Sequence, residues 1–211
     1  MQNYHFMIIF RLGKTSDHVS LAQIHYHSGQ FQNDGFMYRL GFDFLKRYYK
    51  VLLSEKQSFV LVAEDSSGNI HGFVSGTQNA NSHLSAIRND RIFLALTLLK
   101  SVIFRPAILK EILRRYKYVN KINDAESFGA IDGARLEYWI WDTDSSSNLS
   151  ALLLKAWINI MKEMGVNEIH GEVDRSNVKS QKVHKLMGAV FYDTKILTDG
   201  RERTFYKYIL K

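Results

Sequence analysis

Three groups of residues in the C-terminal half of the chain could carry out chemistry. Glu137, Glu172 and Asp174 lie in strand-forming runs, and a carboxylate can act as a general base. His184 lies in a short helical run, and an imidazolium with an unperturbed pKa of about 6.5 is a competent general acid. The run 145–150 (SSSNLS) precedes a long apolar helical run, and backbone N–H groups at a helix N-terminus can bind phosphate.

Each group also has a purely structural explanation. Glu137 shares one face of a strand with Arg135 and could form an ion pair there. His184 could be a helix-surface residue without a role, and the serine–asparagine cluster could simply cap the helix that follows it. The residues alone leave both explanations open for each group.

The composition predicts one folded domain spanning residues 1–211. Hydrophobic residues make up 45% of the chain and aromatic residues 13%, which is enough for a packed core. The sequence contains no cysteine, which excludes disulfides, thiolate metal sites and cysteine nucleophiles, and we expect no metal site. The start of the chain (MQNYHFMIIF) lacks the features of a signal peptide, so we expect a cytoplasmic protein.

The whole net charge of +7 is carried by the segment 83–121. This segment has nine basic residues against Asp90 and Glu111, whereas the rest of the chain has 19 basic and 19 acidic residues. A basic surface here would favour an anionic partner. The basic residues are Arg88, Arg91, Lys100, Arg105, Lys110, Arg114, Arg115, Lys117 and Lys121.

Runs of apolar residues predict the elements that must position these groups. Short runs of β-branched and aromatic residues favour strands, apolar residues at spacings of three and four favour helices, and clusters of Asp, Ser, Gly and Asn favour turns. Within the basic segment, Pro106 should separate two helical runs, 92–104 and 107–118. The other expected strands and helices are strands at 5–12, 58–63, 70–76, 134–141, 168–173, 189–197 and 203–210, and helices at 15–28, 36–53, 149–164 and 176–187.

The order of these elements and several local motifs resemble the GNAT (Gcn5-related N-acetyltransferase) family. SFVLVAEDSSGNIHGFVSG is similar to the second and third strands of the family, and ARLEYWIWDTDSSSNLSALLLKAW stands where the family has its acetyl-CoA site. The pattern Val173-x-x-x-Asn177-x-x-Ser180, followed by His184 and Met187-Gly188, resembles a further family signature. The resemblance covers most of the chain outside residues 78–133.

The resemblance implies an α+β fold and an acetyl transfer reaction. The fold would be a mixed, mostly antiparallel central sheet flanked by helices, with the basic segment 83–121 as a helical insertion between the third and fourth strands. The reaction would transfer an acetyl group from acetyl-CoA to a small-molecule amine. Backbone groups of Ile140 and Trp141 would receive the pantetheine arm and the thioester carbonyl.

The remaining site residues follow from the same resemblance. The family's pyrophosphate loop usually reads R/Q-x-x-G-x-G/A, and the chain departs from this pattern at every defined position. Glu137 would accept the proton of the amine, with Glu172 and Asp174 as alternatives, and His184 stands where many relatives have a tyrosine that protonates the leaving thiolate. The loop would consist of Ser145, Ser146, Ser147, Asn148, Leu149 and Ser150, and the CoA arm would also contact Asn177 and Ser180.

The sequence alone identifies neither the acceptor of the acetyl group nor the partners of the protein. The basic segment would favour an anionic acceptor such as a nucleotide-linked amino sugar, or else a lipid-linked acceptor at a membrane interface. The degenerate loop also allows a non-catalytic binding protein with the same fold. The apolar run 92–104 must be covered by the sheet, by a second subunit in a homodimer, or by a peripheral membrane contact. We expect no nucleic-acid binding, because the basic segment contains no recognised motif.

Overall fold

A computed structural model describes residues 7–31, 35–120, 132–142, 149–196, 200 and 202–211. Its seven strands confirm the strands expected from the sequence. They are β1 (Ile8–Leu12), β2 (Ser58–Asp65), β3 (Ile70–Thr77), β4 (Ala134–Trp141), β5 (Glu168–Asp174), β6 (Val190–Ile196) and β7 (Glu202–Ile209).

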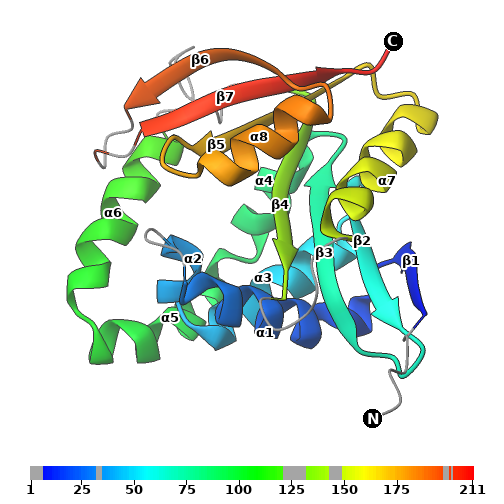
Figure 1. Ribbon diagram of the computed structural model, residues 1–211. Helices are drawn as coiled ribbons and strands as arrows, with labels where there is room; N and C mark the ends of the chain where they lie inside the picture. Colours follow the sequence, from blue (N-terminus) through cyan, green and yellow to red (C-terminus); the bar gives the residue numbers. More distant parts are fainter. Residues whose placement is uncertain (1–6, 32–34, 121–131, 143–148, 197–199, 201) are drawn as a thin grey trace.

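The helices of the described residues surround this sheet (Figure 1). A short 3₁₀ turn (Thr15–Asp17) leads into the first of them. They are α1 (His18–Gly29), α2 (Phe36–Arg39), α3 (Phe42–Ser54), α4 (Ala80–Asn89), α5 (Arg91–Phe104), α6 (Ala107–Asn120), α7 (Ser150–Glu163) and α8 (Val178–Leu186).

The strands form one sheet in the order β1-β2-β3-β4-β5-β7-β6. All neighbouring strands are antiparallel except β4 and β5, which are parallel. The sheet is thus mixed and mostly antiparallel, as expected.

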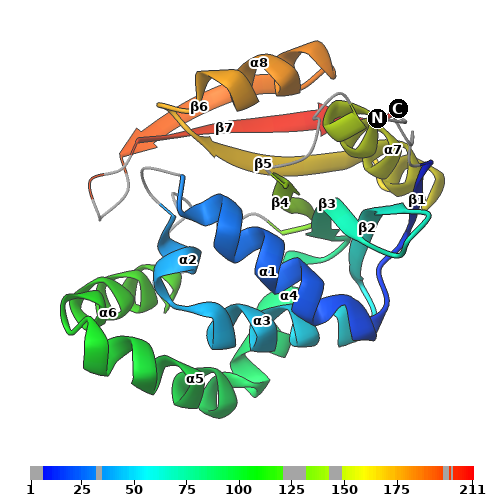
Figure 2. The ribbon, with the colours of Figure 1, turned by 60° about the horizontal axis from the view of Figure 1, so that its bottom comes forward.

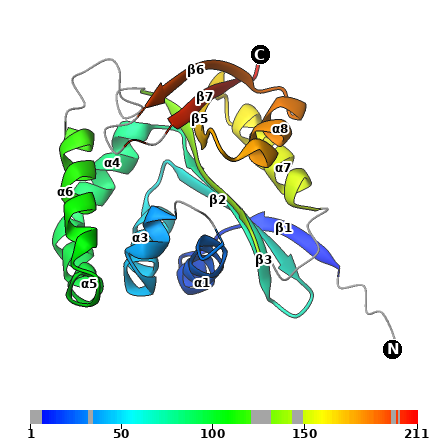
Figure 3. The same ribbon diagram turned by 60° about the vertical axis from the view of Figure 1, so that its left-hand side comes forward.

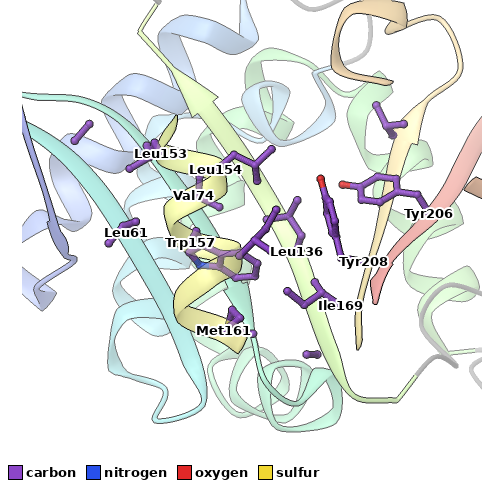
Figure 4. Packing of buried hydrophobic residues seen from close by; sticks show 14 residues of the cluster. Leu61, Val74, Leu136, Leu153, Leu154, Trp157, Met161, Ile169, Tyr206 and Tyr208 are labelled. Carbon is purple, nitrogen blue, oxygen red and sulfur yellow. The ribbon is translucent and has the colours of Figure 1, made fainter. Parts of the chain in front are cut away.

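Helices cover both faces of the sheet, which Figures 2 and 3 show from two directions. One hydrophobic cluster joins the sheet to α7 and α8, and a second cluster joins it to α1 and α3. Trp157 of α7 lies at the centre of the first cluster, beside Leu136 and Met161 (Figure 4). Its indole N–H donates a hydrogen bond to the carbonyl of Phe59 at 3.2 Å, which ties α7 to β2.

The stretch 36–53 was expected to be one helix, and this prediction was wrong. The chain forms α2 and α3 instead, and Gly41 between them has a φ of +96°, a left-handed conformation that ends a helix. The carbonyl of Leu40 accepts a hydrogen bond from Ser101 Oγ at 2.7 Å, so this interruption also anchors α5. The apolar stripe of α3 packs as expected, with Leu45, Tyr48, Tyr49 and Leu52 buried.

Three helices of the described residues follow β3 in the chain and precede β4. The sequence predicted α5 and α6 and the break at Pro106 between them, but it did not predict α4. Of the three covers considered for the run 92–104, the sheet is not the main one, because α5 packs chiefly on α3 and also on α4 and α6. Of the apolar residues of α5, Leu94 is the one that becomes buried. None of the described helices is both long and apolar enough to cross a membrane.

Candidate functional site

The strands β4 and β5 separate soon after they meet. Their parallel pairing is limited to Ala134 with Ile169 and Arg135 with His170, and beyond these pairs the two strands diverge. A cavity of about 520 Å³ lies where they diverge, lined by residues of β4, β5, β7, α1 and α8. We call this opening the β4–β5 gap.

A β-bulge in β4 places Glu137 at the start of this gap. Leu136 lies opposite Gly76 and Tyr138 lies opposite Ser75, so Glu137 is an extra residue without a partner on β3. Bulges redirect side chains and are frequent beside active sites.

The bulge changes the face to which the following residues point. Without it, alternate residues of β4 would share one face of the sheet. Instead Leu136 packs in the cluster around α7, whereas Tyr138 and Ile140 pack in the cluster around α1 and α3. The carboxylate of Glu137 lies at this changeover and lines the cavity.

The surroundings of Glu137 are largely buried. Its Oε1 atom is 3.7 Å from Nε of Arg135, beyond hydrogen-bond distance, and has no hydrogen-bond partner. Burial raises the pKa of Tyr48 and of Tyr49, and the nearby Tyr138 and Glu137 raise both further. The expected pair of Arg135 and Glu137 is therefore present, inside the cavity and not on an exposed strand surface.

His25 lines the same cavity, and the sequence analysis missed it. Its Nδ1 is 2.5 Å from the hydroxyl of Tyr49, and its ring centroid is 4.8 Å from that of Tyr138. Burial lowers the pKa of His25 to about 3, so the ring is neutral at pH 7. The helical periodicity of α1 would have predicted that His25 faces the protein interior. It would not have predicted that Tyr138 of β4 lies opposite its ring.

Backbone groups of β4 face the β4–β5 gap at alternate residues. The N–H of Asp142 donates to the carbonyl of His71 on β3 at 2.7 Å, and Trp141 O accepts from Ser28 Oγ at 3.2 Å. Since hydrogen-bonded and non-hydrogen-bonded pairs alternate along an antiparallel ladder, the backbone groups of Trp139 and Trp141 point away from β3, towards the side of β5, whereas those of Ile140 point to β3. Ile140 and Trp139 both line the cavity, and the backbone of Ile140 pairs with Phe73 of β3.

The two alternative bases, Glu172 and Asp174 of β5, each have a polar partner in the structure. Glu172 Oε1 is 3.5 Å from Nη2 of Arg203, and Asp174 Oδ1 accepts hydrogen bonds from the backbone N–H and the hydroxyl of Ser176. All four residues line the cavity.

Asn177 and Ser180 line the cavity at the start of α8. Asn177 is the N-cap of this helix, and its side-chain oxygen accepts a hydrogen bond from Ser180 N–H at 3.1 Å. The structure thus gives both residues a capping role.

His184 is buried, with both ring nitrogens facing tyrosine hydroxyls. Nδ1 is 2.6 Å from the hydroxyl of Tyr208, Nε2 is 3.2 Å from that of Tyr206, and the ring stacks on Tyr206. Burial lowers the pKa of His184 to about 4, which corrects the expectation of an imidazolium near its ordinary pKa. A neutral ring can donate from one nitrogen while it accepts at the other.

The helix α7 begins where the sequence places the pyrophosphate loop. Leu149 is the N-cap residue of α7 and forms no side-chain cap, and Ser150 is the first helical residue. The carbonyl of Ser150 accepts a hydrogen bond from Trp139 Nε1 at 3.1 Å, which holds this helix end against β4. Ser145, Ser146, Ser147 and Asn148 lie outside the described residues.

Comparison with models of known protein families and with curated proteins finds no match to this sequence. Solved structures are similar to it over nearly its whole length. The Salmonella typhimurium protein yncA, solved with its cofactor acetyl-CoA, is 13% identical and covers 97% of this chain and 95% of its own, with a TM-score of 0.60. A GNAT-family acetyltransferase from Streptococcus pneumoniae is 12% identical and covers 97% of this chain and 100% of its own, with a TM-score of 0.59.

A third similar structure is the spermidine N-acetyltransferase from Vibrio cholerae in complex with CoA and spermine. It is 11% identical and covers 96% of this chain and 95% of its own, with a TM-score of 0.59. At these identities the similarity establishes the fold. The chain has the fold of the GNAT acetyltransferases.

Proposed function

We propose that this protein is an N-acetyltransferase that transfers an acetyl group from acetyl-CoA to a small-molecule amine. One observation carries the proposal. The β4–β5 gap brings backbone groups of β4 that point away from β3 together with the half-buried carboxylate of Glu137, whose Oε1 atom is buried, in one cavity of about 520 Å³. Such a cavity can hold a thioester and an amine side by side.

The described residues suit the pantetheine and pyrophosphate of acetyl-CoA. Backbone groups of Trp139 and Trp141 would pair with the pantetheine amides as a further strand would. The N-cap residue of α7, Leu149, forms no side-chain hydrogen bond to the first turn of the helix. The backbone N–H groups of this turn would bind the pyrophosphate. When bound, acetyl-CoA supplies an acetyl group that its thioester already activates for transfer.

Glu137 is the group that would take the proton of the attacking amine. Its Oε1 atom has no hydrogen-bond partner, whereas Glu172 lies against Arg203 and Asp174 accepts two hydrogen bonds from Ser176. Removing a proton makes the amine nucleophilic, and a positioned base typically accelerates this step about 10²–10⁴-fold.

His184 would act within a chain of hydroxyl groups and not as a free acid. The neutral ring connects the hydroxyl of Tyr208 with that of Tyr206, which lines the cavity. Tyr206 would donate its proton to the leaving sulfur, which forms the free thiol of CoA. The Tyr206 phenolate would accept a hydrogen bond from Nε2–H of His184 until it regains a proton from solvent through the cavity after product release. His184 would thus support the proton donor Tyr206 from the position at which many relatives have a tyrosine as the donor itself.

The charges of the cavity favour a small cationic amine as the acceptor. Glu137, Glu172 and Asp174 line it against Arg135 and Arg203. No described residue of the segment 83–121 lines it, so the charge argument for an anionic sugar nucleotide does not apply. The similarity in fold to a spermidine N-acetyltransferase agrees with a small amine.

Two measurements test the proposal. Calorimetric titration with acetyl-CoA measures binding, and release of the CoA thiol in the presence of a panel of primary amines measures transfer. We expect binding without any amine and thiol release only with one. Absence of acetyl-CoA binding would instead support a non-catalytic protein with this fold.

A further inference from the structure

We propose that the outer face of α5 docks on a membrane surface that contains anionic phospholipids. The inference is independent of the proposed reaction, because this face lies away from the β4–β5 gap. In Figure 3 the pair of α5 and α6 forms the layer farthest from α7, beyond α3 and α1.

The outer face of α5 is a stripe of exposed apolar side chains, which we call the α5 stripe. Its members are Ile92, Leu96, Leu99 and Ile103, and between 56% and 74% of each is exposed. Their spacing of three and four residues places them on one side of the helix. Exposed apolar patches of this kind mark interaction sites more often than ordinary solvated surface.

The inner face of α5 is firmly attached to the protein. Leu94 is buried against α3, and Ser101 Oγ donates to the carbonyl of Leu40 at 2.7 Å. The α5 stripe therefore cannot turn inward without breaking these contacts.

Positive charge is in excess on α5 and on the helices next to it in the chain. The acidic residues among the described part of the basic segment are Asp90 and Glu111, and each is paired with an arginine from outside it, Arg47 and Arg39. This leaves six basic residues of the described part without an acidic residue of the segment to offset them. They are Arg88, Arg91, Lys100, Arg105, Lys110 and Arg114. Cations beside exposed apolar residues are typical of helices that lie in the interface of an anionic membrane.

A groove of about 520 Å³ between α3 and α5 continues the stripe. Phe93 and Leu96 form its apolar side, and Lys50 and Lys100 line it without an ion-pair partner among the described residues. Arg47 stacks on Phe93 with its guanidinium carbon 4.6 Å from the ring centroid. The groove thus places apolar side chains beside cationic ones. This arrangement matches the apolar acyl chains and the anionic phosphate of a phospholipid.

A second copy of the chain fits this face less well. A symmetric contact brings the same surface of both subunits together, and here it would oppose two segments of high positive charge. An anionic lipid surface satisfies both the apolar stripe and the cations around it.

The test is flotation of the full-length protein with phosphatidylcholine vesicles, with and without phosphatidylserine. We expect binding that requires phosphatidylserine and weakens with salt. Leu96→Ser with Ile103→Ser should abolish it. Lys50→Glu with Lys100→Glu should weaken it more than about 25-fold, since each lysine near such a surface contributes roughly fivefold.

Matched controls lie on α7, on the other side of the sheet (Figure 3). Leu152 is 51% exposed and Lys155 is exposed, so Leu152→Ser and Lys155→Glu should leave flotation unchanged. Circular dichroism confirms that every variant is folded, as substitution of exposed residues should allow. The proposal is overturned if the wild-type protein does not float, or if the α5 variants float as well as the controls.

Light scattering tests the alternative in which a second copy of the chain, and not a membrane, covers the α5 stripe. A dimer of the wild-type protein that dissociates on Leu96→Ser with Ile103→Ser would make the α5 stripe a contact between two copies, and would overturn the membrane proposal. A monomer that floats with anionic vesicles supports it.

Discussion

The carboxylate of Glu137 lies 3.7 Å from the guanidinium Nε of Arg135, at the point where β4 bulges and where its pairing with β5 ends. Arg135 is the last residue of β4 that pairs with β5, and Glu137 is the extra residue of the bulge. Pairing with β5 thus ends, and a half-buried carboxylate enters the β4–β5 gap, within two residues of β4.

We expect Glu137→Gln to lower kcat by about 10²–10⁴-fold, because the amide cannot accept the proton of the amine. The dissociation constant of acetyl-CoA should stay unchanged, since the proposed contacts of acetyl-CoA come from the β4 backbone and from α7. Steady-state kinetics and calorimetry measure the two quantities. Glu172→Gln is the matched control, and a larger loss of rate in this variant would move the base to β5.

We expect acetyl-CoA to stabilise the protein against heat. A ligand at about 100 times its dissociation constant stabilises the folded state by about 2.7 kcal/mol, which corresponds to roughly 5–10 °C in Tm for a domain of this size. Differential scanning calorimetry over a series of concentrations measures this shift. An unchanged Tm at millimolar acetyl-CoA would contradict the proposed function.

We expect stability to fall on acidification from pH 6.5 towards pH 4. Burial lowers the pKa of His184 to about 4, so in this window the unfolded chain, with a histidine pKa of about 6.5, binds a proton that the folded chain does not. The free energy of unfolding therefore decreases by about 3 kcal/mol for this residue across the window. His25, whose pKa burial lowers to about 3, acts in the same direction.

Urea unfolding at several pH values tests the contribution of His184. His184→Gln should be less stable at pH 7, because it disturbs the contacts with Tyr206 and Tyr208, but its stability should depend less on pH between 6.5 and 4. Leu152→Ser, an exposed and non-titrating position of α7, should keep the dependence of the wild-type protein. Equal slopes in all three proteins would be inconsistent with a buried neutral His184.

We expect Gly41→Ala to destabilise the protein more than Gly68→Ala. Both glycines have positive φ, +96° and +87°, and an alanine there costs about 1–2 kcal/mol in backbone strain. A Cβ at Gly41 would in addition lie 2.5 Å from Ser101 Oγ, whereas none of the surrounding atoms lies within 4 Å at Gly68. Urea unfolding should show an extra loss of about 1 kcal/mol at Gly41, the value of one hydrogen bond. Equal losses would mean that Ser101 does not anchor α5.

The sequence by itself determined the seven strands and most of the helices of this protein, although it missed α4 and the division between α2 and α3. Runs of β-branched and aromatic residues, such as ARLEYWIW for β4, predicted the seven strands, and Pro106 predicted the break between α5 and α6. These signals are local, because they depend on the conformational preferences of a few neighbouring residues. Their order was also enough to indicate the fold.

Only the tertiary structure decided the register and the burial on which the site depends. The bulge at Glu137 and the separation of β4 from β5 arise from pairing between distant strands, which no run of neighbouring residues encodes. In the same way, His184 is neutral because Tyr206 and Tyr208 of β7 enclose it, and a helical position alone does not predict this. The helical stretch 36–53 is interrupted at Gly41, and Leu40 beside it accepts a hydrogen bond from Ser101, 61 residues away in the chain.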